Sequence, residues 1–173
     1  MASTLSEGDG QALLRAAIGQ SDASMTPAQM AQLLSCIVNG GTRYQGYLLY
    51  DVRNFTSGDV VSKTQATALS SLTLNAEGRH LLIKTMADIA KKDSSLMGCQ
   101  QNLADKGLTL GCFYSTSPSG TVADSHAILL GFVTPSVGEG ASLCVSVVVE
   151  NGGEAEKFSS IISSIVGEYE WDS

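Results

Sequence analysis

Three strand-like runs in the C-terminal half constrain the fold more than any other feature of this chain. They span Leu108–Tyr114, Ala127–Val133 and Leu143–Val149, and each is bounded by Gly, Pro, Ser or Asn. The connections between them are only about a dozen residues or fewer and carry no helical pattern. Because parallel pairing needs a longer crossover, the three runs are predicted to form an antiparallel sheet.

Amphipathic helices are predicted on both sides of these runs. A C-terminal apolar stripe must lie on the sheet to be buried; it comprises Phe158, Ile161, Ile162, Ile165 and Tyr169. Upstream, helices are predicted within residues 11–39 and 74–92, the latter with Leu82, Met86, Ile89 and Ala90 on one stripe, and a loop is predicted to follow it through Gly98. Residues 44–61 read as a hairpin arm with a turn at 54–58. The predicted class is α+β, an antiparallel sheet with flanking helices.

Composition and charge exclude several classes of protein. The chain has 173 residues, 43% of them hydrophobic, and its 10 Lys and Arg against 17 Asp and Glu give a net charge of −7. This acidic balance argues against nucleic-acid binding. No run of about 18 apolar residues exists, so no membrane segment is predicted. Residues 1–9 are predicted to be a disordered or tag-like terminus, and residues 10–173 a single domain.

The cysteines give no sign of a metal site. Cys36, Cys99, Cys112 and Cys144 are widely spaced, with no CxxC pair and no histidine at metal-ligand spacing. They are interpreted as free thiols that pack as small apolar groups. No cofactor is predicted.

Several local motifs, in order, resemble the C-terminal part of the transpeptidase domain of class B penicillin-binding proteins. Residues 17–41 are similar to that family's AIGQG, TPLQMA and AIANGG signatures, residues 126–135 to its HAWFVGFAP strand, and residues 143–152 to its AVVVENG strand. The positions that carry the match are Gly19, Gln20, Thr26, Pro27, Asn39, Gly40, Gly41, His126, Gly131 and Phe132.

The resemblance implies a partial β-lactamase/transpeptidase-like fold. Two further strands and the helix that carries the catalytic serine complete the sheet in the whole family domain. Without them, strand 143–149 is predicted to be an open apolar edge, which favours a homo-oligomer. The resemblance also implies the extracytoplasmic face of a bacterial cell membrane as the location. The implied partners are cell-wall synthesis proteins or the rest of a penicillin-binding protein.

The family's catalytic motifs are missing from this sequence. Members of the family acylate a serine in Ser-x-x-Lys, with Ser-x-Asn completing the proton network and Lys-Thr-Gly holding the substrate. No Lys here has a serine three residues before it, and no Asn has one two residues before it. A gapless alignment of the third motif places Cys112 at its lysine, Phe113 at its threonine and Tyr114 at its glycine. No catalytic residue is therefore predicted.

Other candidate residues favour structural roles. Lys63-Thr64 resembles a broken Lys-Thr-Gly motif, but it precedes a helix rather than the strand that begins at His126, so a solvated lysine is the better interpretation. His126 is expected to have a structural role in a turn rather than a catalytic role. Cys112 has no nearby His or Asp in sequence to activate it, and an apolar strand raises the pKa of a thiol, so packing is favoured over nucleophilic chemistry.

Three functions remain open at this point. The first is a penicillin-binding-protein-like domain of cell-wall synthesis that is catalytically incompetent. The second is a fragment of an active D-Ala-D-Ala transpeptidase whose serine lies upstream, although the absent lysine at Cys112 weighs against it. The third is an unrelated small binding module.

Overall fold

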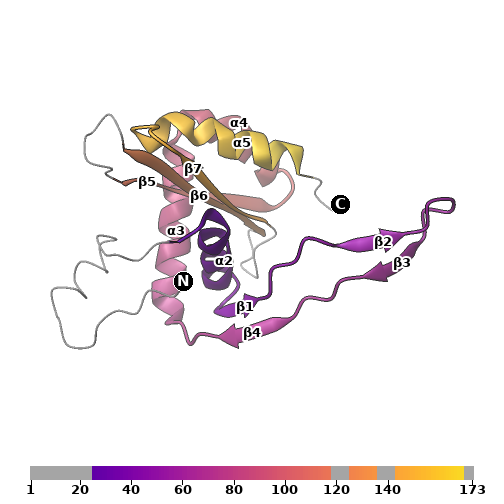
Figure 1. The fold of residues 1–173 in the computed structure, drawn as a ribbon. Coiled ribbons are helices and arrows are strands. Elements are labelled where there is room, and N and C mark those ends of the chain that lie inside the picture. The colour runs from indigo at the N-terminus through magenta and orange to yellow at the C-terminus, as the bar shows by residue number, and fades with distance from the viewer. Residues whose placement is uncertain (1–24, 118–124, 136–142, 170–173) are drawn as a thin grey trace.

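The α+β class is confirmed in the computed structural model, which describes residues 25–117, 125–135 and 143–169 (Figure 1). Its helices are α2 (Pro27–Val38), α3 (Ala76–Lys92), α4 (Met97–Ala104) and α5 (Ser159–Glu168), with 3-10 turns at Ser94–Leu96 and Ala155–Phe158. Its strands are β1 (Thr42–Tyr44), β2 (Asp51–Arg53), β3 (Val60–Lys63), β4 (Ala68–Ser71), β5 (Leu108–Ser117), β6 (His126–Pro135) and β7 (Leu143–Val149).

The predicted central sheet is present in the order β5-β6-β7, with both pairs antiparallel. Gly131 in the middle strand lies opposite Cys112 on one side and Val145 on the other. Residues directly opposite one another in a sheet point to the same face. This register therefore decides which side chains of each strand lie on each side of the sheet.

Two apolar clusters cover the two faces of the sheet. Leu129 and Val133 pack with Ile162 and Val166 of α5 in one cluster, and Phe132 packs with residues of α2 and α3 in the other. Figure 1 shows α5 along one face and α2 beneath the opposite one. Each fully buried apolar side chain contributes roughly 1.5–3 kcal/mol, so these clusters are the main source of stability.

Helix α2 is defined by caps at both ends. Thr26 and Gln29 form a reciprocal capping box, and Pro27 occupies the first turn. At the other end, the Arg79 guanidinium of α3 donates to the carbonyl oxygens of Ile37 and Val38 at 3.0 and 2.8 Å. These bonds satisfy carbonyls that a helix end leaves free, and they tie α2 to α3.

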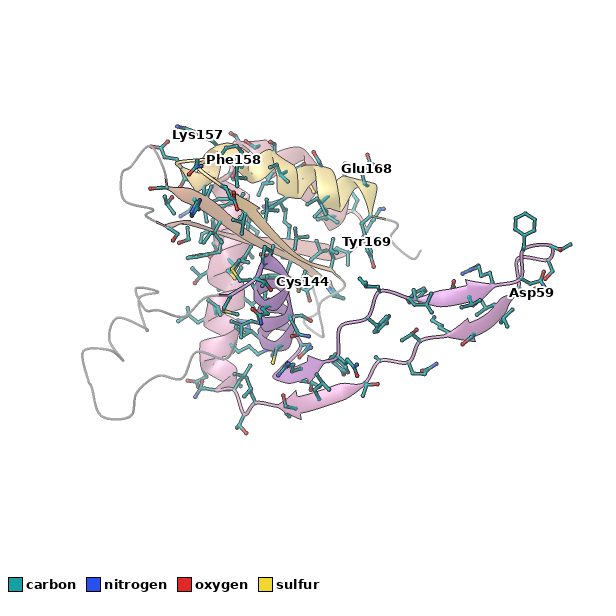
Figure 2. The ribbon with its side chains drawn as sticks, viewed as in Figure 1. Asp59, Cys144, Lys157, Phe158, Glu168 and Tyr169 are labelled. Carbon is teal, nitrogen blue, oxygen red and sulfur yellow. The ribbon has the colours of Figure 1, made fainter. Side chains whose placement is uncertain are left out.

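A long arm joins α2 to α3 and extends away from the sheet (Figure 1). It comprises residues 42–71 and contains the pairs β1-β4 and β2-β3, with Asp59 near its tip (Figure 2). The side chains of Leu48 and Phe55 are fully exposed, at 106% and 104%. The arm therefore adds little to the apolar core.

Parts of the predicted helices were wrong. The loop predicted through Gly98 is the 3-10 turn followed by α4, a helix that lacks a side-chain cap and has only Leu103 buried, so its sequence gives a weak signal. Leu82 is 43% exposed, because α3 buries Met86, Ala87 and Ala90 instead. In α5 the buried residues are Ser159, Ile162 and Val166, whereas Ile165 and Tyr169 are exposed.

The N-terminal predictions lie outside the described residues. These are the terminus at 1–9, the part of the predicted 11–39 helices that precedes residue 25, and the motif residues Gly19 and Gln20. Within the described part of the chain, no helix is long and apolar enough to cross a membrane.

Candidate functional site

Strand β5 holds the three positions at which the resemblance places Lys-Thr-Gly. Successive side chains of a strand point to opposite faces, so Cys112 and Tyr114 share one face and Phe113 lies on the other. The Cys112 side chain is completely buried in the cluster beneath α5, and Phe113 is 43% exposed. None of the three positions offers a cation.

A short chain of hydrogen bonds connects this strand to the end of α3. The Cys112 thiol donates to the Tyr114 hydroxyl at 3.1 Å, and that hydroxyl donates to Asp93 Oδ2 at 2.7 Å. Asp93 also accepts from the Ser95 backbone N–H at 2.8 Å and from the Ser159 side chain. One carboxylate thus links α3, β5 and the start of α5.

The electrostatics of these groups favour one fixed protonation state. Burial raises the pKa of the Cys112 thiol to about 11, and burial raises the pKa of the Tyr114 phenol as well. Burial alone would raise the pKa of Asp93, but the hydrogen bonds it accepts outweigh that effect and lower the pKa. At neutral pH the chain of groups is therefore thiol, phenol and carboxylate, with every proton already in a hydrogen bond.

A surface hollow of about 400 Å³ opens beside Asp93 and Tyr114. Its other lining residues are Ile89, Lys92, Ser94 and Glu156. A covalent catalyst needs a nucleophile next to a group that can take its proton. The Cys112 thiol is buried and protonated, and the pKa of Asp93 is lowered, so these two groups do not form such a pair.

Two glycines of the sheet lie where a side chain would meet close packing, more severely at Gly111 than at Gly131. A Cβ on Gly111 would lie 2.3 Å from the ring of Phe132, which is fully buried, and a Cβ on Gly131 would lie 3.2 Å from Ile162. Gly131 and Phe132 are both positions of the resemblance. In this chain Gly111 leaves room for the Phe132 ring on one face of the sheet, and Gly131 leaves room for Ile162 of α5 on the other.

The motif Asn39-Gly40-Gly41 forms the junction between α2 and the arm. The Asn39 side chain bonds both the N–H and the carbonyl of Thr42. Gly41 has φ of 112°, and a Cβ there would lie 2.1 Å from the Leu72 carbonyl oxygen. The backbone can turn this tightly only with glycine.

The remaining candidates lie apart from the β5 positions. His126 begins β6, and its Nδ1 accepts from the backbone N–H of Asn151, which has φ of 54°. Lys63 is in the arm, with its ammonium 4.8 Å from the centre of the Tyr50 ring. The described residues contain no cluster of three His, Cys, Asp or Glu side chains that could hold a metal ion.

Sequence reasoning missed Asp93 altogether. The signal available was its position directly after Lys91-Lys92, where a helix was expected to end. Its bond to Tyr114 joins residues 21 positions apart. A pattern of local periodicity carries no information about that contact.

Comparisons with known proteins agree on one family and fold. The sequence profile of the penicillin binding protein transpeptidase domain matches residues 5–161. Among curated protein sequences, none matches this chain.

Similar solved structures include penicillin-binding protein 2B from Streptococcus pneumoniae strain R6, with 16% identity and a TM-score of 0.60 over 96% of this chain. A second is a D,D-transpeptidase domain of a peptidoglycan glycosyltransferase from Eggerthella lenta, with 18% identity and a TM-score of 0.53 over 81% of this chain. A third is Pseudomonas aeruginosa PBP2, with 16% identity and a TM-score of 0.54 over 91% of this chain. The chain spans 29%, 32% and 32% of their respective lengths. At this identity the structures establish the fold, while the profile match over most of the sequence shows that the chain belongs to the penicillin binding protein transpeptidase domain family.

Proposed function

We propose that this chain is a non-catalytic member of its family, which serves cell-wall peptidoglycan synthesis as a scaffold or partner domain rather than as a transpeptidase. The proposal includes an extracytoplasmic location at the bacterial cell membrane, where the family's substrate is found. Its partners would be other proteins of cell-wall synthesis.

The observation that carries this proposal is the state of β5. A transpeptidase strand needs a cation facing the substrate carboxylate, because Lys and Arg hold carboxylates by charge-assisted hydrogen bonds. Here Cys112 points into the core, with its thiol donating to Tyr114. On the opposite face, Phe113 supplies neither charge nor a hydrogen-bond donor.

The sequence supports the proposal independently of the geometry. None of the 173 residues completes a Ser-x-x-Lys or a Ser-x-Asn motif. In the family these two motifs lie upstream of the segment that residues 17–41 resemble, so what bears on activity within this sequence is the substrate cation, and no lysine stands at positions 112–114.

Labelling with a fluorescent penicillin tests the proposal. The purified chain is incubated with the reagent, denatured and separated on a gel, beside a transpeptidase that has all three motifs. We expect fluorescence on the control protein and none on this chain. Release of D-alanine from a D-Ala-D-Ala peptide should likewise stay at the rate without protein. Covalent labelling of this chain would overturn the proposal.

A further inference from the structure

We propose that Asn151 is a site of spontaneous covalent modification, where the side-chain amide is lost through a cyclic imide formed with Gly152. The identical tripeptide Asn39-Gly40-Gly41 is protected by the fold. These are the two places in the sequence where an asparagine precedes glycine. Glycine favours this reaction because it has no side chain to hinder its backbone nitrogen. The inference does not depend on whether the domain is catalytic, since neither motif contains the β5 positions.

The reaction needs only the two residues and water. The backbone nitrogen of Gly152 attacks the side-chain carbonyl carbon of Asn151, so that a C–N bond forms within a ring. The bond from that carbon to the amide nitrogen breaks, and ammonia leaves with the proton of the glycine nitrogen. Water then adds to either carbonyl of the imide and opens the ring. The products are aspartate, in which the main chain is unchanged, and isoaspartate, in which the main chain runs through the side-chain carbon.

The attacking nitrogens are held alike in the two motifs. The Gly152 N–H donates to the Val149 carbonyl oxygen at 3.3 Å, and the Gly40 N–H donates to the Ile37 carbonyl oxygen at 3.3 Å. Both bonds are longer than the roughly 2.9 Å that is typical of backbone hydrogen bonds. Because the tripeptides and the attacking groups match, the asparagine side chains distinguish the two sites.

The Asn39 side chain is fixed by hydrogen bonds at both of its polar atoms. Its Nδ2 donates to the Thr42 carbonyl oxygen at 2.9 Å, and its Oδ1 accepts from the Thr42 N–H at 3.0 Å. The amide must break both bonds before its carbon can approach the Gly40 nitrogen. Asn39 is also only partly exposed, at the end of α2. The fold therefore opposes imide formation at this motif.

The Asn151 side chain is held by no such bonds. Among the described residues, no group forms a hydrogen bond with its amide, and the residue is exposed to water. Its backbone, by contrast, is anchored, because its N–H donates to His126 Nδ1 at 3.2 Å. Its φ of 54° is the only positive value of a non-glycine residue in the described part of the chain. The reactive amide is thus free, and the water that opens the imide has access to it.

The two products differ in what they do to the turn after β7. Aspartate adds a negative charge beside Glu150, but it tolerates a positive φ as asparagine does, so the turn is retained. Isoaspartate adds a carbon to the main chain between two anchoring bonds. These are the bond from the residue 151 N–H to His126 and the bond of 2.9 Å from the Gly153 N–H to the Ser125 carbonyl oxygen. The longer chain puts them out of register, so the isoaspartate form should be the less stable one.

Peptide mapping by mass spectrometry tests the proposal on the full chain, incubated in mildly alkaline buffer both folded and in urea. In urea the two asparagines should convert at similar rates, because their tripeptides are identical. In the folded protein Asn151 should convert roughly tenfold faster than Asn39 or more, because two hydrogen bonds must break at Asn39 and none at the Asn151 amide. The modified peptide should elute as two products of equal mass, aspartate and isoaspartate, each with one oxygen from heavy-oxygen water.

Two variants serve as controls. Asn151→Gln should show no conversion at residue 151, since its longer side chain closes the ring poorly, and should leave the rate at Asn39 unchanged. Asn151→Asp should unfold at nearly the same temperature as the parent, whereas the isoaspartate fraction of aged protein should unfold at a lower one. Equal rates at the two asparagines of the folded protein, or no conversion at Asn151 while it converts in urea, would overturn the proposal. Aspartate without isoaspartate would exclude the imide route and overturn it as well.

Discussion

The Tyr114 hydroxyl donates a hydrogen bond of 2.7 Å to the carboxylate of Asp93. This bond connects β5 to the residue that ends α3, and the same carboxylate accepts from Ser159 at the start of α5. Tyr114 stands where a gapless alignment places the glycine of the family's Lys-Thr-Gly motif. A position associated with substrate binding in the family thus holds three structural elements together in this chain.

Tyr114→Phe should destabilise the protein by about 1–2 kcal/mol, because a hydrogen bond to a charged group is lost in a partly exposed setting. The lowered pKa of Asp93 stabilises the folded state above the unfolded pKa, and that contribution disappears as the pH falls through the folded value. The variant should therefore lose less stability on acidification. Urea unfolding at about pH 7 and about pH 3 measures both effects.

The matched control for this change is Tyr47→Phe, which alters an exposed tyrosine of the arm. We expect its free energy of unfolding to stay within about 0.5 kcal/mol of the parent. Equal losses in the two variants would show that the Asp93 bond contributes nothing.

The Cys112 thiol should resist alkylation at pH 8. Its pKa is raised to about 11, so little thiolate is present, and the side chain is completely buried. Cys99, which is partly exposed, should react first. Peptide mapping after iodoacetamide treatment measures both rates, and modification of the folded protein at Cys112 as fast as at Cys99 would contradict the buried, protonated state.

The same thiol should make stability fall in alkaline solution. Folding raises the pKa of the Cys112 thiol from 9.0 to about 11. The thiol's contribution to the free energy of unfolding is therefore complete below the unfolded pKa and is lost as the pH rises from the unfolded to the folded pKa. Unfolding midpoints measured between about pH 8 and pH 11 should fall less in Cys112→Ala than in the parent. A parallel decline in both proteins would contradict this effect.

Gly111→Ala should destabilise the sheet by about 1–3 kcal/mol, because the new methyl group would overlap the buried ring of Phe132. Gly98→Ala is the control, since nothing lies within 4 Å of a Cβ at that position in α4. That variant should be neutral or up to about 1 kcal/mol more stable. Thermal unfolding of the two proteins distinguishes a steric effect from a general cost of replacing glycine.

The arm should tolerate polar substitutions that the core does not. Leu48→Ser and Phe55→Ser remove side chains that are fully exposed, so unfolding free energies should change by less than about 0.5 kcal/mol. Phe132→Ala should cost about 3–5 kcal/mol, because that ring is completely buried. A large loss at Leu48 would mean that the arm packs against the body of the protein.

The sheet could be predicted because Val, Ile and Leu runs bounded by turn residues are a strong local signal, and β5, β6 and β7 each contain the predicted run. Helix α4 was missed because its sequence, MGCQQNLA, has neither a cap nor a clear apolar stripe. In α5, periodicity identified the helix but could not say that Val166 rather than Ile165 is buried. That choice depends on how the helix lies on the sheet.

The candidate site, like the fold, could be predicted from the sequence only in part. The absence of a lysine at 112–114 is visible in the sequence, since it requires only residue identity. The direction of Cys112 follows from the pairing Cys112↔Gly131, and its bond to Tyr114 and on to Asp93 follows from tertiary packing. No spacing rule connects residues 93 and 114.

The function proposed above holds that the residues of this chain do not form an acyl-enzyme. Intact-protein mass spectrometry after prolonged incubation with benzylpenicillin tests it most directly, because a covalent adduct adds the mass of the whole antibiotic. We predict an unchanged mass at every time and concentration at which a transpeptidase with all three motifs is fully acylated. A stoichiometric adduct on any serine or cysteine of this chain would contradict the proposed function.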